Sequence, residues 1–216
     1  MRNKKGIGLI LCGLLLLAAA FALTLYNIQI QKAAGIASRE ILEELVAEIP
    51  EDSVVQLGKA LDDPNVPDTS AQEEFIPDYI LNPNMDMPEK EVNGGNYIAT
   101  LTIPSLELEL PVNTAWNYEN LKNSPCRFSG SAYTGDLVIC AHNYDIHFGS
   151  IKYLDVGDSV ILTDMDGNVF HYEVIETETL DPYAVEQMKS GDWDLTLFTC
   201  TVGGATRVTV RCELVQ

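Results

Sequence analysis

The sequence predicts an all-β fold, a barrel or sandwich, preceded by an N-terminal transmembrane helix and a stalk. Two observations lead to this prediction. The C-terminal half contains short apolar runs separated by turn residues, with few long helical patterns. The N-terminus contains an uncharged apolar run long enough to cross a bilayer. We expect strands over residues 97–103, 106–112, 135–141, 159–163, 169–176, 195–200 and 207–214, and short helices over 117–123 and 181–190.

The predicted membrane segment comprises residues 6–28, roughly 35 Å as a helix. Arg2, Lys4 and Lys5 precede it, which places the N-terminus in the cytoplasm and the rest of this single-pass chain outside the cell membrane. A cleaved signal peptide is the alternative, since residues 18–20 are alanines. The apolar run continues beyond them and exceeds a signal-peptide core, so we favour an uncleaved anchor over residues 1–28.

Residues 29–95 are interpreted as a stalk. Residues 29–49 show a helical spacing of apolar residues that ends at Pro50, which suits a spacer or, as the alternative, a partner helix. The remainder is acidic and interrupted by prolines, and predicts an extended tether. Its candidate contacts with the following domain are Phe75, Ile76, Tyr79, Ile80 and Leu81. Gly94 and Gly95 mark the boundary to a catalytic domain over residues 96–216.

The net charge of -19 excludes an ordinary nucleic-acid-binding protein, because phosphate contact requires a basic face. The five cysteines are Cys12, Cys126, Cys140, Cys200 and Cys212. The four outside the membrane segment could form two disulfides. They could equally be buried thiols at Cys140 and Cys212, a thiol of undefined state at Cys126 and one reactive thiol at Cys200.

Cys200 ends a strand in which Thr196, Phe198 and Cys200 share one face. Gly203 and Gly204 then indicate a turn, and Arg207 opens the next strand. A thiol at the end of a strand is held rigidly and remains accessible, which suits a nucleophile. Because free cysteine is more often simply buried, the interpretation depends on partner residues.

The chain has three histidines that could act as the partner of Cys200. His142 follows the apolar strand at the point where it enters a loop, a usual place for a catalytic group. His147 lies in that loop and could contact substrate, whereas His171 reads as a half-exposed residue within a strand.

We expect no metal and no cofactor. The spacing of the histidines and cysteines contains neither HExxH nor CxxC, which disfavours zinc. Residues 164–168 resemble the start of a calcium loop, but the required downstream glutamate is missing and a hairpin turn explains them better.

Cys200, His142 and Arg207 together supply the parts of acyl-transfer chemistry. The reaction needs a nucleophilic thiol, a group that protonates a leaving amine, and a cation or donor for a developing oxyanion. Arg211 is an alternative for the arginine, since it shares a strand face with Arg207, but Arg207 is nearer the end of the cysteine strand.

The sequence Thr196-Leu197-Phe198-Thr199-Cys200 resembles the TLxTC signature of the sortase family, and Arg207 matches its essential arginine. Residues 137–143 resemble the strand leading to the family's histidine, with Ala141 in place of the usual glycine. The resemblance covers residues 97–215 and leaves class B, D or E open. It implies an eight-stranded β-barrel, with His142, Cys200 and Arg207 as catalytic residues and Thr199 and Asn143 as substrate-binding residues.

The resemblance also implies a cysteine transpeptidase. Its substrates would be secreted proteins with a C-terminal sorting motif, and its acceptor an amine of peptidoglycan or of a pilin subunit. Two alternative functions differ from this one in what they require of the sequence. An L,D-transpeptidase lacks support because its SHGC-like signature is missing. A non-catalytic, membrane-anchored β-domain acting as an assembly partner would have a buried, inert Cys200.

Overall fold

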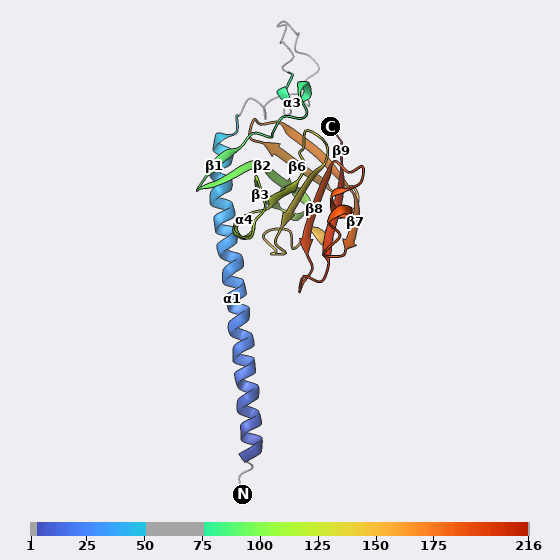
Figure 1. Ribbon diagram of the computed structural model, residues 1–216. Coiled ribbons are helices and arrows are strands. Elements are labelled where there is room, and N and C mark those ends of the chain that lie inside the picture. The colour runs from blue at the N-terminus through green and yellow to red at the C-terminus, as the bar shows by residue number, and fades with distance from the viewer. Residues whose placement is uncertain (1–3, 51–75, 216) are drawn as a thin grey trace, which may run out of the picture.

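The structure, a computed structural model, describes residues 4–50 and 76–215 and consists of a β-barrel beside one long helix (Figure 1). The helix, α1, runs without interruption from Lys4 to Glu48. Its first half projects away from the barrel, and its second half lies along the barrel's side (Figure 1). The part of the predicted acidic tether between residues 51 and 75, including Phe75, lies outside the described residues.

The projecting half of α1 exposes a continuous apolar surface, from Ile7 to Ile28. This helix is long and apolar enough to cross a membrane. In the other half, Ala34, Ser38 and Leu45 are buried at intervals that place them on one face of the helix. That face packs against the barrel and forms a small hydrophobic cluster with it. This packing favours the alternative interpretation of residues 29–49, a partner helix, over a simple spacer.

The described chain forms one sheet of nine strands, whose bounds are β1 (Lys90–Val92), β2 (Gly95–Ile103), β3 (Leu108–Asn113), β4 (Cys126–Ser129), β5 (Leu137–Ala141), β6 (Ser159–Asp164), β7 (Val169–Leu180), β8 (Leu195–Cys200) and β9 (Arg207–Leu214). The order β2-β3-β4-β5-β8-β9-β7-β6 closes because β6 pairs with β2. The predicted eight-stranded barrel is confirmed. The short strand β1 adds to one end of β2 beside Tyr97. Neither β1 nor β4 was among the predicted strands.

Most neighbouring strands are antiparallel, but β3 and β4 pair in parallel at one position and β5 and β8 run parallel along their length. Parallel neighbours end at the same edge of a sheet, so the residues that follow β5 and β8 meet at one end of the barrel. The connection between β5 and β8 contains β6 and β7, which explains how residues 58 positions apart, Ala141 and Thr199, become neighbours.

Short helices fill the connections: α3 (Asp78–Leu81), η1 (Pro104–Leu106), α4 (Tyr118–Asn123), η2 (Ile151–Tyr153) and α5 (Val185–Lys189). The two helices predicted over 117–123 and 181–190 correspond to α4 and α5. Asn117 caps α4, because its side-chain oxygen accepts hydrogen bonds from the backbone N–H groups of Glu119 and Asn120.

The barrel interior is a single apolar core. The side chains of β8 point alternately into this core and to the outer face of the barrel. Leu195 and Leu197 are fully buried inside. Phe198 and Cys200 point to the outer face and are only half-buried. A site that uses Cys200 therefore lies on the outside of the barrel wall, where loops and α5 can cover it.

Residues 76–89 of the predicted stalk pack against the end of the barrel opposite Cys200. The Tyr79 ring stacks on Tyr133 with centroids 4.6 Å apart, and Met87 is buried in the barrel core. Tyr79 thus makes the predicted contact with the domain, whereas Ile80 and Leu81 remain exposed.

Candidate active site

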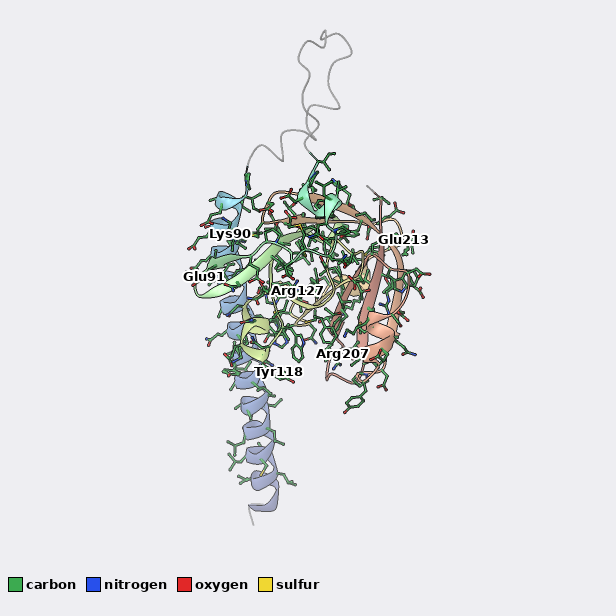
Figure 2. The ribbon with its side chains drawn as sticks, turned by 45° about the horizontal axis from the view of Figure 1, so that its top comes forward. Lys90, Glu91, Tyr118, Arg127, Arg207 and Glu213 are labelled. Atoms are coloured by element: carbon green, nitrogen blue, oxygen red, sulfur yellow. The ribbon has the colours of Figure 1, made fainter. Side chains whose placement is uncertain are left out.

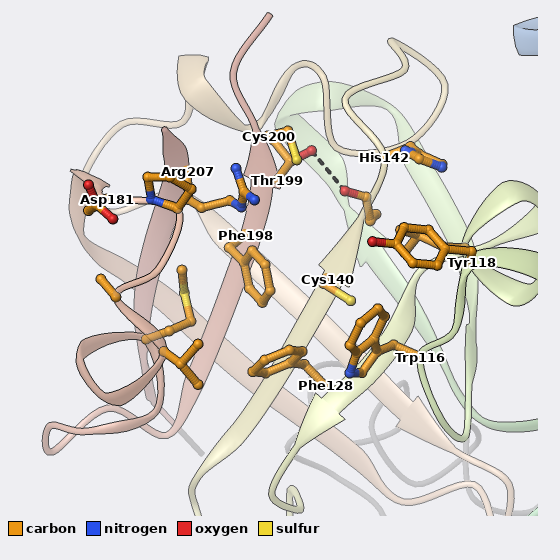
Figure 3. A pocket seen from close by; sticks show the side chains of 16 residues that line it. Trp116, Tyr118, Phe128, Cys140, His142, Asp181, Phe198, Thr199, Cys200 and Arg207 are labelled. Carbon is orange, nitrogen blue, oxygen red and sulfur yellow. Dashed lines mark hydrogen bonds between the residues drawn. The ribbon is translucent and has the colours of Figure 1, made fainter. Parts of the chain in front are cut away.

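Three neighbouring strands bring the predicted catalytic residues together. On β5 and β8, Ala141 is the register partner of Thr199, so the next residues, His142 and Cys200, follow at the same edge. On β8 and β9, Cys200 is the register partner of Arg207. Cys200 therefore lies between the other two, with Arg207 on one side and His142 on the other (Figure 3).

All three residues line one pocket of about 360 Å³ on the outer face of the barrel. Apolar side chains form most of the wall, and the polar groups gather near Cys200 (Figure 3). No described residue of the predicted stalk, 29–50 or 76–95, lines this pocket. A mainly apolar cavity with a few convergent polar groups is typical of a binding site.

An aromatic wall was not predicted from the sequence. The Phe128 ring lies edge-on to the Phe198 ring, with ring centroids 5.2 Å apart. The ring centroid of Trp116 lies 5.9 Å from that of Phe128. Tyr118 extends this wall, 6.0 Å from Trp116. Alternation along β8 does place Phe198 on the face of Cys200. Nothing in the local pattern around Trp116 or Tyr118 indicates that they would join it.

Cys200 differs from the other barrel cysteines in its accessibility. All five cysteines are free thiols, so neither of the two disulfides that the sequence would permit is formed. Burial raises the pKa of Cys126 and of Cys212 to about 12, and it also raises the pKa of Cys140. These three thiols are buried and protonated at neutral pH, whereas Cys200 is half-buried beside the pocket.

His142 begins a compact loop. Its carbonyl oxygen accepts a hydrogen bond from the Phe148 N–H at 3.1 Å, and its ring stacks on Tyr144 with centroids 4.8 Å apart. Gly149 permits this fold, because a Cβ there would come within 2.8 Å of the Asn143 and Tyr144 backbone. Burial lowers the pKa of His142, and the nearby Lys122 lowers it further. The imidazole is thus disposed to be neutral near pH 7.

His147 and His171 lie outside the pocket. The His147 side chain is fully buried beneath Tyr144, so it is not available to contact substrate. Within the described chain, neither ring nitrogen of His147 makes a hydrogen bond of normal geometry. The Asn123 backbone nevertheless lies close enough to raise the pKa of His147, against the effect of burial. The burial of His147 and, to a lesser extent, the nearby His142 lower the pKa of His147 to about 4. His171 is half-buried within β7.

The two arginines considered for the oxyanion have different surroundings. Arg207 donates from Nη1 to the carbonyl oxygens of Gly204 and Thr206, both at 3.1 Å, and its side chain lines the pocket. Arg211 is 2% exposed and bonds to the Glu178 carboxylate. Its remaining donors go to the Met188 and Gln187 carbonyls and the Thr196 hydroxyl. Arg211 therefore joins β7, α5 and β8, and Arg207 is the arginine that faces the pocket.

The two expected substrate-binding residues have different positions. Thr199 contributes to the pocket wall, but it is buried and its hydroxyl donates to the Ala141 carbonyl oxygen at 2.8 Å. That bond fastens β8 to β5 directly beside Cys200 and His142. Asn143 is half-buried and does not contribute to the pocket wall.

The turn between β6 and β7 contains the sequence that resembles a calcium loop. The buried Asp164 carboxylate accepts hydrogen bonds from the backbone N–H groups of Asp166 and Asn168, from the Asn168 side chain and from the Tyr133 hydroxyl. These bonds explain the acidic residue as part of a hairpin turn, as predicted.

Comparison with known families and structures gives evidence about the family and the fold of this chain. The Sortase domain model matches residues 101–215, which include β8, β9 and the strand before His142. No curated protein matches the sequence at a significant level.

Several solved structures have the same fold. A Clostridium perfringens Sortase D5 transpeptidase is 19% identical with a TM-score of 0.53, over 87% of this chain and 99% of that one. Sortase C2 of Group B Streptococcus pilus island 1 is 20% identical (TM-score 0.51, covering 62% and 85%). Listeria monocytogenes sortase A is 24% identical (TM-score 0.50, covering 56% and 88%). At these identities the likeness concerns the fold.

Proposed function

This chain belongs to the sortase family, and on that basis we propose that it is a membrane-anchored cysteine transpeptidase. Its substrates are secreted proteins with a C-terminal sorting motif, and the acceptor is an amine of peptidoglycan or a pilin subunit. The observation that carries the proposal is the register of strands β5, β8 and β9. This register sets Cys200 opposite Arg207 and beside His142, the residue that follows Ala141.

The first half-reaction is an acyl transfer to sulfur. The Cys200 thiol gives its proton to the neutral imidazole of His142 as Sγ bonds to the carbonyl carbon of the scissile peptide. The negative charge that develops on the carbonyl oxygen is stabilised by the Arg207 guanidinium, which already faces the pocket. The tetrahedral intermediate collapses, the C–N bond breaks, and the His142 imidazolium protonates the leaving amine.

The second half-reaction releases the enzyme. The acceptor amine attacks the thioester carbon, and the neutral imidazole of His142 takes its proton. The C–S bond then breaks, and the same proton returns to the Cys200 sulfur as the new amide forms. The lowered pKa of His142 supports this step, since the imidazole is neutral and ready to act as a base near pH 7.

The surroundings support these roles in different ways. The apolar wall of Trp116, Phe128 and Phe198 excludes water from the thioester, which favours transfer to an amine over hydrolysis. Thr199 is a positioning residue, because its hydrogen bond to Ala141 fixes the spacing of the strands that carry Cys200 and His142. Asn143, in the loop just after His142, is proposed to bind the substrate backbone.

We further propose that residues 1–28 anchor the chain in the cell membrane, with the N-terminus in the cytoplasm and residues 96–216 outside as the catalytic domain. The apolar half of α1 supports the anchor, and the basic residues before it support the orientation.

The test uses the full chain in phosphatidylcholine vesicles with a panel of quenched sorting-motif peptides and an added amine. Amine-dependent ligation that is lost in Cys200→Ala, His142→Ala and Arg207→Ala is the expected result. If no peptide is cleaved and Cys200 resists alkylation in the folded protein, the non-catalytic β-domain replaces the enzyme as the better account.

A further inference from the structure

The joint between α1 and the barrel fixes how far the barrel stands from the membrane. The apolar surface of α1 ends at Ile28, and the buried face begins at Ala34. Because α1 is one uninterrupted helix, these two residues are about 9 Å apart along its axis. No flexible linker separates the membrane segment from the docked segment.

This distance is close to the thickness of a lipid headgroup layer. A bilayer measures about 40–45 Å in total around a hydrocarbon core of about 30 Å, which leaves about 5–8 Å of headgroups on each side. With Ile28 at the edge of the hydrocarbon, Ala34 lies at the outer limit of the headgroups. With α1 along the bilayer normal, any part of the barrel that extends more than a few ångströms beyond Ala34 toward the N-terminal half of α1 therefore lies among the headgroups.

The active-site end of the barrel extends in that direction. Figure 1 shows β8 pointing toward the N-terminal half of α1, with the β8–β9 loop beyond it. Figure 2, in a different orientation, places Tyr118 and Arg207 at this end and Lys90 and Glu213 at the opposite end. The connection before α5 is at the same end, because Leu180 is the register partner of Arg207.

Exposed apolar and aromatic side chains gather at this end. Tyr118 is 75% exposed, Tyr183 is 89% exposed and Val202 is 91% exposed, and Trp116 lies beside Tyr118 with 43% exposure. We call these four residues the pocket rim, since each belongs to a segment that also lines the pocket or contains Cys200. Tyrosine and tryptophan are the residues that membrane interfaces favour, because their rings combine an apolar body with a polar tip.

We infer that the pocket rim is a lipid-contact surface: it lies in the headgroup layer of the bilayer that α1 spans, and the pocket with Cys200 opens at the membrane surface. The inference rests on the membrane anchoring proposed above. All four rim residues are uncharged, so the contact depends on burial at the interface and not on attraction to anionic lipids, which the net charge of -19 would oppose.

The chain provides its own probes for a test. It contains two tryptophans, Trp116 on the rim and Trp193 just before β8. Because β8 spans about 20 Å, Trp193 lies at the opposite end of the barrel from Cys200 and serves as a matched control. A third reporter, Phe21→Trp in a chain with both native tryptophans replaced by phenylalanine, monitors the insertion of α1.

The experiment places full-length Trp193→Phe and Trp116→Phe proteins in phosphatidylcholine vesicles with quenchers attached at the headgroup, and the Phe21→Trp reporter in vesicles with quenchers attached along the acyl chains. We expect several-fold stronger quenching of Trp116 than of Trp193. Thermal unfolding of each variant verifies that the barrel is intact. In a further variant of Trp193→Phe, about two helical turns are inserted after Gln29, which raises the barrel by about 11 Å. The quenching of Trp116 should then fall to the level of Trp193.

Each other outcome has a definite meaning. Equal quenching of Trp116 and Trp193, with the Phe21→Trp reporter quenched from within the bilayer, overturns the lipid contact and leaves the anchor intact. Quenching of Trp116 that the insertion does not change also overturns it. A Phe21→Trp reporter that no lipid quencher reaches refutes the anchor itself, and the lipid contact with it.

Discussion

Gly35 of α1 lies directly against Ile146 in the loop that begins with His142. A Cβ at Gly35 would come within 3.0 Å of the Ile146 Cδ1 atom. The helix that carries the proposed membrane segment therefore supports the loop that carries the proposed acid and base. The Asn143-to-Gly149 backbone is tightly folded, so pressure on Ile146 would be transmitted toward His142.

The first prediction concerns this contact. Gly35→Leu places a branched side chain where a Cβ atom alone would already lie 3.0 Å from the Ile146 Cδ1 atom. Overpacking of this kind costs about 1–3 kcal/mol. We expect a lower kcat and a shifted pH profile in the peptide assay, because the His142 loop is displaced. The matched control is Gly13→Leu, since Gly13 has no neighbouring atom within 4 Å. Equal activity of both variants would contradict the proposed support.

The second prediction separates the two arginines. Arg211→Met leaves the Glu178 carboxylate and the buried carbonyls without their donor, so it should lower the free energy of unfolding by about 3–5 kcal/mol. Arg207→Met should abolish ligation with a change in unfolding below about 1 kcal/mol. Denaturant unfolding and the ligation assay on both variants measure this. A stable, inactive Arg211→Met protein would reverse the two roles.

The third prediction concerns thiol reactivity. In a Cys12→Ser background, iodoacetamide should modify Cys200 alone in the folded protein at neutral pH. Burial keeps the other three thiols protonated and inaccessible, with a pKa of about 12 for Cys126 and Cys212. Mass spectrometry of tryptic peptides identifies the site. Modification of Cys126 or Cys140 at a comparable rate would contradict the burial of these thiols and show that the paired strands β4 and β5 open to solvent.

The fourth prediction is a pH dependence of stability caused by His147. Its pKa falls from an ordinary 6.5 in the unfolded chain to about 4 in the fold. As the pH falls through this window the unfolded chain binds a proton that the folded chain does not, so the free energy of unfolding decreases. The loss should reach about 3 kcal/mol.

Denaturant unfolding between pH 7 and pH 4 measures this loss. His147→Phe, which removes the titrating group and fills a similar volume, should flatten the dependence. Since His142 shifts in the same direction, a part of the slope will remain. An unchanged slope in His147→Phe would show that His147 does not titrate in this way.

The sequence was sufficient to predict the strands that carry Cys200 and Arg207, but not the elements around them. Strands β8 and β9 match their predicted bounds because alternation and a glycine turn define both. Strand β1 has three residues and β4 has four, too few to show a period. Their position depends on pairing with β2 and β5, which no local pattern reveals.

The surroundings of the site were the least predictable part. Trp116 and Phe128 approach Phe198 only because β3, β4, β5 and β8 are neighbours in the closed sheet. The docking of α1 escaped prediction for a similar reason. The apolar face containing Ile41 and Leu45 is visible in the sequence, but its partners, Tyr97 and Met165, come from β2 and the β6–β7 turn.

The most direct test of the proposed chemistry is the intact mass of the full-length protein mixed with a cleavable sorting peptide in the absence of an amine. The account predicts a covalent adduct equal to the acyl fragment of the peptide, located on Cys200 by digestion and released by hydroxylamine. The adduct should be absent in Cys200→Ala and should transfer its acyl group when an amine is added. Peptide cleavage that proceeds in Cys200→Ala, or an adduct on any other residue, would contradict it.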